Sequence, residues 1–271
     1  MRYNFNYKTG KDDVMKIRIF GDRKNPAIVL IHGAFCDYGS VMHFAKYLED
    51  DFFLIVPTLD GHYPDSKDYS SAPKQARILN IALQKMEIEN LAMIHGTSMG
   101  AVVALEMAKH ISADNYFFDA GSFFKLAGIA KSIACNKLIK LSGSFKNSSA
   151  DEVLKNRSVL WFCGDDPEKY RDTVESIVKN LGSVTENTIK NIAESCYNYH
   201  LPHFDNEITK KFIFHFSDRE PAHECKKRLE KKYPLARFSD YSGKNYCGFQ
   251  TKEPELYAQY LKDIINNSVD M

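Results

Sequence analysis

Long apolar segments are absent from this 271-residue sequence, in which no run reaches the ~18 apolar residues that a membrane-spanning helix requires. The first residues, MRYNFNYKTGKDDVMKI, also lack the apolar core of a signal peptide. Cysteine is scarce and scattered, with six residues and no CxxC pair: Cys36, Cys135, Cys163, Cys196, Cys225 and Cys247. Scattered cysteines favour free thiols in a reducing compartment over disulfides or a zinc site. We therefore expect a cytoplasmic protein without a membrane span.

An excess of charge of either sign is also lacking. Lysine and arginine total 36 against 35 acidic residues, which leaves a formal net charge of +1. Nucleic-acid binding usually requires a basic surface, so we expect no nucleic-acid partner. The sequence contains no GxxxxGK[ST], GxGxxG or HExxH motif and no EF-hand spacing, so we expect no cofactor and no metal. It gives no indication of an oligomeric state.

What the sequence does contain is an alternation of buried strands and helices. Continuous apolar runs predict strands buried on both faces at 27–33 (AIVLIHG), 52–58 (FFLIVPT) and 91–96 (LAMIHG). Apolar residues at helical spacing lie between these runs, and the pattern resumes at 210–216 (KKFIFHF). This order predicts the α/β class, with a mostly parallel central sheet flanked by helices.

The alternation stops between residues 123 and 207, where the sequence predicts several helices and one competing strand at 159–164 (VLWFCG). We therefore expect a core formed by residues 1–122 and 208–271, with a helical cap inserted at 123–207. Apolar residues near the start of this insertion favour a small-molecule substrate with an apolar portion: Phe123, Phe124, Leu126, Ile129 and Ile133.

The most informative motif is a serine between two glycines, GTSMG at 96–100. A predicted buried strand precedes it and a predicted helix follows at once, which is the context that a GxSxG nucleophile turn requires. The glycines leave room at a tight junction, and the start of the helix directs backbone N–H groups at any oxyanion formed there. The same five residues also occur as an ordinary turn without chemistry. We predict that Ser98 is a nucleophile.

With this motif the chain resembles the α/β-hydrolase superfamily. IVLIHGAF (28–35) is similar to the family's strand followed by HGx, and VPTLDGHYPDS is similar to its next strand and DGHG-type turn, with Tyr63 where glycine is usual. The resemblance implies an oxyanion hole formed by the backbone N–H groups of Ala34 and Met99. It also implies that the helical insertion covers the active site.

The resemblance places the acid of a catalytic triad after the first strand that follows the cap. FIFHFSDREPA is similar to that segment, which puts Glu220 at the acid position and leaves Asp218 as the near alternative. The same acidic turn also suits the first turn of a helix that begins at Pro221, for reasons of the helix dipole alone.

The expected base is missing. In the resembled family a histidine lies in the loop after the last strand, but no histidine follows His223, and Tyr246 or Cys247 occupies the place. Phenol and thiol, with ordinary pKa values near ~10 and ~8.5, are poor bases at neutral pH. His200 and His203, near the end of the insertion, are possible substitutes because a triad is defined by geometry. A polar turn is the other explanation for them.

Two functions follow from these residues. The first is a serine hydrolase, carboxylesterase-like, that acts on an ester or related acyl compound with an atypical or incomplete triad. The second is a catalytically degenerate relative that binds a small molecule or partner without turnover. The missing histidine favours the second, whereas the intact serine motif favours the first.

Overall fold

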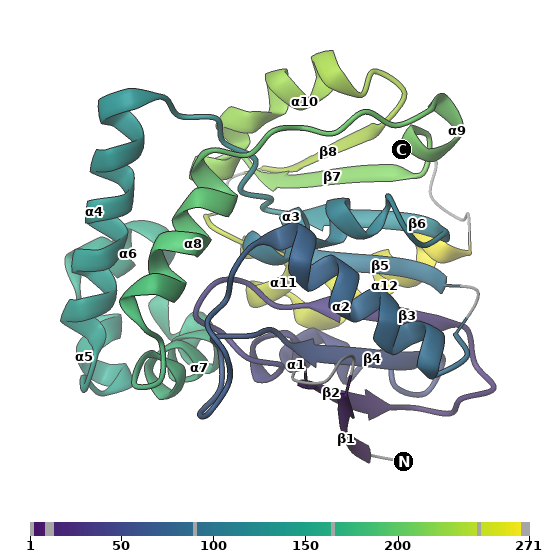
Figure 1. Ribbon diagram of the computed structural model, residues 1–271, viewed down its shortest axis with the longest axis horizontal. Helices are drawn as coiled ribbons and strands as arrows, with labels where there is room; N and C mark the ends of the chain where they lie inside the picture. Colours follow the sequence, from purple (N-terminus) through teal and green to yellow (C-terminus); the bar gives the residue numbers. More distant parts are fainter. Residues whose placement is uncertain (1–2, 9–13, 89–90, 164–165, 243–244, 267–271) are drawn as a thin grey trace.

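The computed structural model describes residues 3–8, 14–88, 91–163, 166–242 and 245–266, and within them the centre of the molecule is one eight-stranded sheet (Figure 1). The strand order is β1-β2-β4-β3-β5-β6-β7-β8. β2 runs antiparallel to both of its neighbours, β1 and β4, and all the pairs from β4 to β8 are parallel. The strands are β1 Tyr3–Lys8, β2 Val14–Phe20, β3 Ala27–Ile31, β4 Phe53–Thr58, β5 Leu91–Thr97, β6 Ala113–Asp119, β7 Phe212–Ser217 and β8 Arg237–Tyr241. The predicted α/β class and mostly parallel sheet are confirmed.

Alternate residues of the central strands pack against helices on opposite faces of the sheet, as side chains of a strand must. Ile28 and Leu30 of β3 face a cluster that includes Phe44 and Leu261, whereas Val29 faces another cluster. The first face is covered by α1 (Gly39–Ala45) and α12 (Pro254–Ile265), and the second by α2 (Ala72–Lys85) and α3 (Met99–Met107). This two-sided burial explains why the strand sequences are continuous apolar runs.

The chain between β6 and β7 is helical. Its helices up to residue 197 lie at one end of the sheet, and the short helix just before β7 lies at the opposite end (Figure 1). Its helices are α4 Gly128–Phe145, α5 Ala150–Leu154, α6 Arg157–Cys163, the 3₁₀ helix η1 Pro167–Tyr170, α7 Arg171–Leu181, α8 Glu186–Tyr197 and α9 Asn206–Thr209. After β7 come the 3₁₀ helix η2 Pro221–Cys225, α10 Lys226–Lys232 and α11 Gly248–Lys252. In the described part of the chain, no helix combines the length and the apolar content that crossing a membrane takes.

The predicted strand at 159–164 is wrong, because Arg157–Cys163 forms helix α6. A short apolar run does not distinguish a strand from a buried helix, and local polar groups decide between them. Here the side-chain oxygen of Asn156 accepts a hydrogen bond from the Ser158 N–H at 2.9 Å, which satisfies a free donor at the start of the helix.

Hydrogen bonds attach the helices between β6 and β7 to the rest of the molecule. The segments that lead into and out of them run side by side, since Phe124 N–H donates to the Cys196 carbonyl and Tyr199 N–H donates to the Phe124 carbonyl. Farther away, the Asp37 carboxylate accepts bonds from the Ser176 hydroxyl at 2.9 Å and the Lys179 amine at 3.2 Å. These bonds fix α7 over the end of β3.

Candidate active site

Ser98 lies at a strained turn between β5 and α3. Its backbone angles, φ 56° and ψ −114°, fall outside the regions that L-residues prefer. The flanking glycines make the turn possible: a Cβ on Gly96 would lie 2.3 Å from the Gly100 carbonyl oxygen, and one on Gly100 would lie 2.5 Å from those of Ile31 and His32. The turn therefore brings the end of β5, the start of α3 and the end of β3 into direct contact.

The segment after β3 lies against this turn. A Cβ on Gly33 would be 3.5 Å from the Cβ of Ser98, and Ala34 lines the same cavity as Ser98. The His32 ring fixes the segment, because Nδ1–H donates to the Gly33 carbonyl at 2.7 Å while Nε2 accepts the Leu59 N–H at 3.0 Å. Both ring nitrogens are thus occupied by backbone groups, so His32 is a structural residue.

Glu220 follows β7 and is buried. Its Oε2 accepts the Cys247 N–H at 3.0 Å, and its Oε1 has no hydrogen-bond partner. Burial, together with the nearby Asp119 charge, raises the pKa of this carboxyl well above its ordinary value. Asp218, the near alternative, is exposed and accepts a bond from the Ser242 hydroxyl at 3.3 Å. Of the two acids, the structure therefore brings Glu220 to the loop that carries Cys247.

Cys247 occupies the place where the resembled family carries its histidine. It is buried, takes the left-handed backbone conformation with φ 48°, and starts α11. Burial and the neighbouring Asp119 and Glu220 raise the pKa of its thiol well above the ordinary value. The thiol therefore holds its proton more strongly than a free thiol does, which disfavours it as a base at neutral pH.

Tyr246 is the residue of this loop that reaches the serine. Its buried hydroxyl is hydrogen-bonded to the Ser98 side chain, and burial raises its pKa well above the ordinary value. Its carbonyl oxygen accepts a bond from the Tyr170 hydroxyl of η1 at 2.8 Å. Ser98 Oγ also lies 3.3 Å from Ser122 Oγ. The serine hydroxyl is thus surrounded by hydroxyl groups that hold their protons at neutral pH.

A buried polar network that the sequence did not reveal lies behind the turn. The Asp119 carboxylate accepts bonds from Gln250 Nε2 and the Tyr257 hydroxyl, each at 2.7 Å, and its backbone carbonyl accepts the Ser98 N–H at 2.8 Å. His95 Nε2 lies 2.7 Å from the same Tyr257 hydroxyl. The position of Asp119 at the end of an apolar strand is the one signal in the sequence. The two side chains that bond its carboxylate are 131 and 138 residues away.

Ser98 opens on an apolar cavity of about 300 Å³. Seven of its lining residues carry hydroxyl groups: Ser98, Ser122, Ser142, Tyr170, Thr173, Tyr197 and Tyr246. Its apolar lining comes mainly from the helices between β6 and β7: Phe124, Leu138, Leu141, Phe145, Val153, Val159, Val174, Ile177, Leu181 and Ile192. Of the five apolar residues expected there, Phe124 lines it, whereas Ile129 and Ile133 are 79% and 61% exposed. Those two face away because α4 turns its 138–145 half towards the cavity.

No histidine lines this cavity, although all nine lie in the described part of the chain. His200 is exposed, lies 3.4 Å from the Lys125 amine through Nδ1, and lines a different, basic pocket. His203 is exposed as well. The structure therefore does not bring either histidine to Ser98. Among the described residues, no three histidine, cysteine or acidic side chains are gathered so as to hold a metal ion.

The overall fold of the chain is shared with solved structures. A protein of the α/β-hydrolase family from Desulfitobacterium hafniense is 19% identical, with a TM-score of 0.70 over 92% of this chain and 100% of that one. A thermophilic esterase from Thermogutta terrifontis is 14% identical, with a TM-score of 0.73 over 98% of each chain. Naproxen esterase from Bacillus subtilis is 12% identical, with a TM-score of 0.72 over 98% and 92%. The chain therefore has the α/β-hydrolase fold. No family model and no curated protein matches the sequence.

Proposed function

We propose that this protein is a serine hydrolase that acts on a carboxylic ester or related acyl compound with an apolar portion. The observation that carries the proposal is the strained backbone of Ser98 at the mouth of an apolar cavity. In this proposal Ser98 attacks the carbonyl carbon, and the backbone N–H groups of Ala34 and Met99 hold the oxyanion.

The strain at Ser98 supports catalysis over simple binding. A non-glycine residue in such a conformation costs about 1–3 kcal/mol and persists where the surrounding structure enforces it, most often at functional sites. Here the close backbone contacts at Gly96 and Gly100 hold Ser98 in this conformation, and the same contacts leave no room for a side chain at either glycine. A protein that only holds a ligand has no physical need for this serine turn. The esterases among the structural neighbours agree with the proposal.

The lining of the cavity supports an apolar acyl group as the part of the substrate that is bound. A cavity of about 300 Å³, lined mostly by apolar side chains and by a few hydroxyl groups, fits a small ester whose carbonyl lies at Ser98. Sugars and phosphates would bring more polar groups than the hydroxyls of this lining can pair. We therefore propose a short aliphatic or aromatic acyl chain.

Turnover is expected to be slow. Tyr246 and Cys247 both hold their protons at neutral pH, so neither removes the proton of Ser98 efficiently. A well-placed general base is worth about 10²–10⁴-fold in rate, and this is the factor that we expect the site to lack. In the proposal Glu220 is a positioning residue, which holds the 246–247 backbone through the Cys247 N–H.

A second candidate function is binding of an apolar small molecule without turnover. The specific observation in its favour is the buried, protonated thiol of Cys247 at the place of the base. Under this candidate the cavity and the covering helices keep their role, and Ser98 donates a hydrogen bond to the ligand.

A cytoplasmic location stays a prediction from the scattered cysteines.

A fluorophosphonate probe and p-nitrophenyl butyrate distinguish the two candidates. We expect slow covalent labelling and slow ester turnover in the wild type, both abolished in Ser98→Ala. Ser122→Ala is the matched control, since it removes a neighbouring hydroxyl of the same cavity and should retain labelling. His200→Ala and His203→Ala should leave turnover unchanged, because neither side chain reaches the cavity. Absence of both labelling and turnover in the wild type would reject the hydrolase and leave the binding function.

A further inference from the structure

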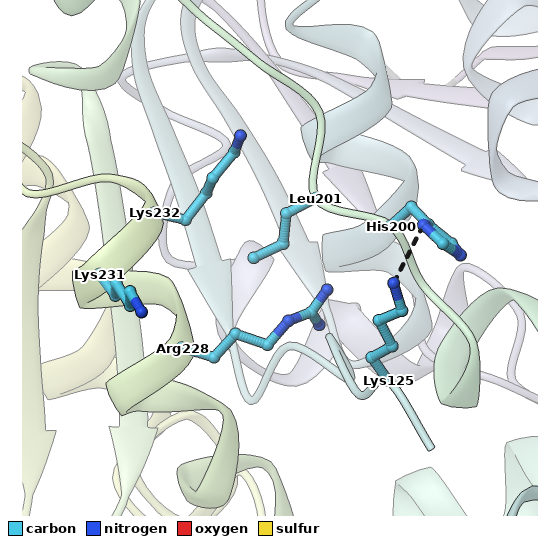
Figure 2. Close-up of a pocket in the computed structure, with 6 residues that line it drawn as sticks. All are labelled: Lys125, His200, Leu201, Arg228, Lys231 and Lys232. Atoms are coloured by element: carbon cyan, nitrogen blue, oxygen red, sulfur yellow. Dashed lines mark hydrogen bonds between the residues drawn. The ribbon is translucent and has the colours of Figure 1, made fainter. Parts of the chain in front are cut away.

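A second hollow, distinct from the cavity at Ser98, lies where the covering helices join the core. It has a volume of about 350 Å³ and is lined by six residues, five of them basic: Lys125, His200, Leu201, Arg228, Lys231 and Lys232 (Figure 2). It shares no lining residue with the cavity at Ser98. Figure 2 shows the amines of Lys125 and Lys232 and the guanidinium of Arg228 around the side chain of Leu201.

The positive charges of this basic pocket are not balanced locally. No carboxylate lines it, and in the described part of the chain none of its lysines or its arginine forms an ion pair with an acidic residue. Lysines outside the pocket do form such pairs. Lys226, which lies on α10 together with Arg228, Lys231 and Lys232, is paired with Asp240. Glu194, an acid in the neighbourhood of His200, uses its two carboxylate oxygens to accept bonds from Lys131 and Asn198. Because the net charge of the chain is only +1, this concentration of one sign is local.

Arg228 is held in place by the protein itself. Its guanidinium donates one hydrogen bond to the Phe123 carbonyl and another, at 2.8 Å, to the Tyr199 carbonyl. These carbonyls belong to the two segments that connect the helices between β6 and β7 to the core. A guanidinium has five N–H donors, so three are left after these two bonds. The group is therefore oriented before a ligand arrives, and part of the entropy cost of binding has already been met.

Lys125 and His200 form a second oriented pair across the pocket. The Lys125 ammonium has only donors, so it donates to His200 Nδ1 across 3.4 Å, and the ring proton then lies on Nε2. The pair presents an ammonium and an N–H donor but no acceptor. Every polar side chain of the pocket is thus a donor, which suits an anion and excludes a neutral ligand that needs acceptors.

We infer that the basic pocket binds a small molecule through a phosphate or diphosphate group. Phosphate oxygens match the fork of a guanidinium and accept several charged donors at once. The volume suits a small ligand, and a chain of net charge +1 does not favour the many phosphate contacts that a nucleic acid would make. Because the ligand would contact both connections and α10, its binding should also stabilise the seating of the helices over the cavity.

Isothermal titration calorimetry with inorganic pyrophosphate tests this inference, with ADP as a second probe at the same ionic strength. Both probes should bind the wild type, and tighter binding of ADP would identify the ligand as a nucleotide rather than free diphosphate. In the variant Lys125→Gln/Lys231→Gln/Lys232→Gln, the Kd for each probe should rise by about tenfold or more. Ser98→Ala should bind as the wild type does, so this test is independent of the proposed hydrolysis.

The matched control is Lys137→Gln/Lys140→Gln/Lys227→Gln, which removes three exposed lysines outside the pocket, one of them on α10. It should retain the wild-type Kd for pyrophosphate. Hydrogen exchange at residues 123–126 and 197–201 should slow when pyrophosphate is bound to the wild type. Equal losses in the two triple variants would show that only net charge matters and would overturn the inference. No binding of either probe, or binding only to phosphatidylserine vesicles, would overturn it as well.

Discussion

Cys247 lies in the loop after the last strand, where the resembled family carries its histidine base. The Cys247 N–H is bonded to the Glu220 carboxylate, and the preceding residue, Tyr246, is hydrogen-bonded to Ser98. The second Glu220 oxygen, Oε1, has no partner. A small cavity of about 70 Å³ adjoins both Tyr246 and Cys247. An imidazole at this position would thus have an unpaired oxygen of Glu220 nearby, and it would follow directly on the residue that contacts Ser98.

We predict that Cys247→His increases the turnover of p-nitrophenyl butyrate by about 10²-fold or more, because it supplies the missing general base. The double variant Cys247→His/Tyr246→Ala should increase it further, since it removes the phenol that contacts Ser98. Steady-state rates near pH 8 provide the measurement, with Cys247→Ala as the control for loss of the thiol. Rates no higher than those of Cys247→Ala would show that an imidazole at 247 does not reach the serine.

Glu220 should make the protein less stable as the pH rises. Its pKa in the folded state is raised by burial, so above its ordinary pKa near ~4.5 the folded state binds a proton that the unfolded state releases. Stability is therefore lost between the ordinary and the raised pKa. We predict that Glu220→Gln is more stable than the wild type at pH 8 and that the difference disappears towards pH 4.5.

Urea denaturation at pH 8 and pH 4.5 measures this difference. The exposed Asp218→Asn is the control, and it should change stability little at either pH. A Glu220→Gln variant that is less stable than the wild type at pH 8 would contradict a protonated, buried Glu220.

At the scale of elements, the junction of β5 with α3 depends on close contact between backbones. A Cβ on Gly100 would lie 2.5 Å from two carbonyl oxygens of the segment after β3, and backbone atoms move at high cost. We predict that Gly100→Ala lowers the free energy of unfolding by more than ~2 kcal/mol, because the turn at Ser98 must open. Fluorophosphonate labelling of Ser98 should be lost together with this stability.

Gly143 provides the matched control. It lies inside helix α4, and a Cβ there would have nothing within 4 Å. Gly143→Ala should stabilise the protein by about 0.5–1 kcal/mol, since alanine loses less entropy in a helix. Thermal denaturation of both variants checks the pair, and a similar effect of the two substitutions would show that the turn is not under tight steric control.

At the scale of the whole molecule, buried histidines should make the protein sensitive to acid. Burial lowers the pKa of His62 and His95 to about 3 and that of His43 to about 4, and it lowers the pKa values of His32 and His215 too. Below the ordinary value near ~6.5 the unfolded chain takes up protons that the folded protein does not, so stability falls as the pH falls. The two buried carboxyls with raised pKa values, Asp119 and Glu220, act in the opposite direction but are outnumbered.

We therefore predict a melting temperature that decreases steadily from pH 6.5 to pH 5. The free energy of unfolding should fall with decreasing pH by an amount that approaches ~1.4 kcal/mol per pH unit for each buried histidine. His95→Gln should reduce the slope, whereas His110→Gln, an exposed position, should not. Differential scanning fluorimetry across this range gives the measurement. A melting temperature that rises on acidification would mean that the carboxyls dominate.

Much of the fold could be predicted from the sequence, because a strand covered on both faces must be apolar throughout. The runs at 27–33 and 52–58 contain β3 and β4, and the run at 91–96 covers all of β5 except its last residue. The strand predicted at 159–164 failed, because a short apolar run lacks the length that distinguishes helix from strand. Ile129 and Ile133 were expected to face the substrate, but α4 exposes them, and the direction of a helix face depends on neighbours distant in sequence.

The sequence by itself determined the parallel sheet, the serine turn and the lack of a histidine after β8. Each of these is a local property, since period, glycine spacing and residue identity are set within a few positions. Only the tertiary structure decided that Glu220 meets Cys247, that Tyr246 contacts Ser98, and that Asp119 lies beneath the turn. It also decided that Lys125 and His200 share a pocket with Arg228. These contacts join residues that are far apart along the chain, and burial, which sets their pKa values, exists only once the chain is packed.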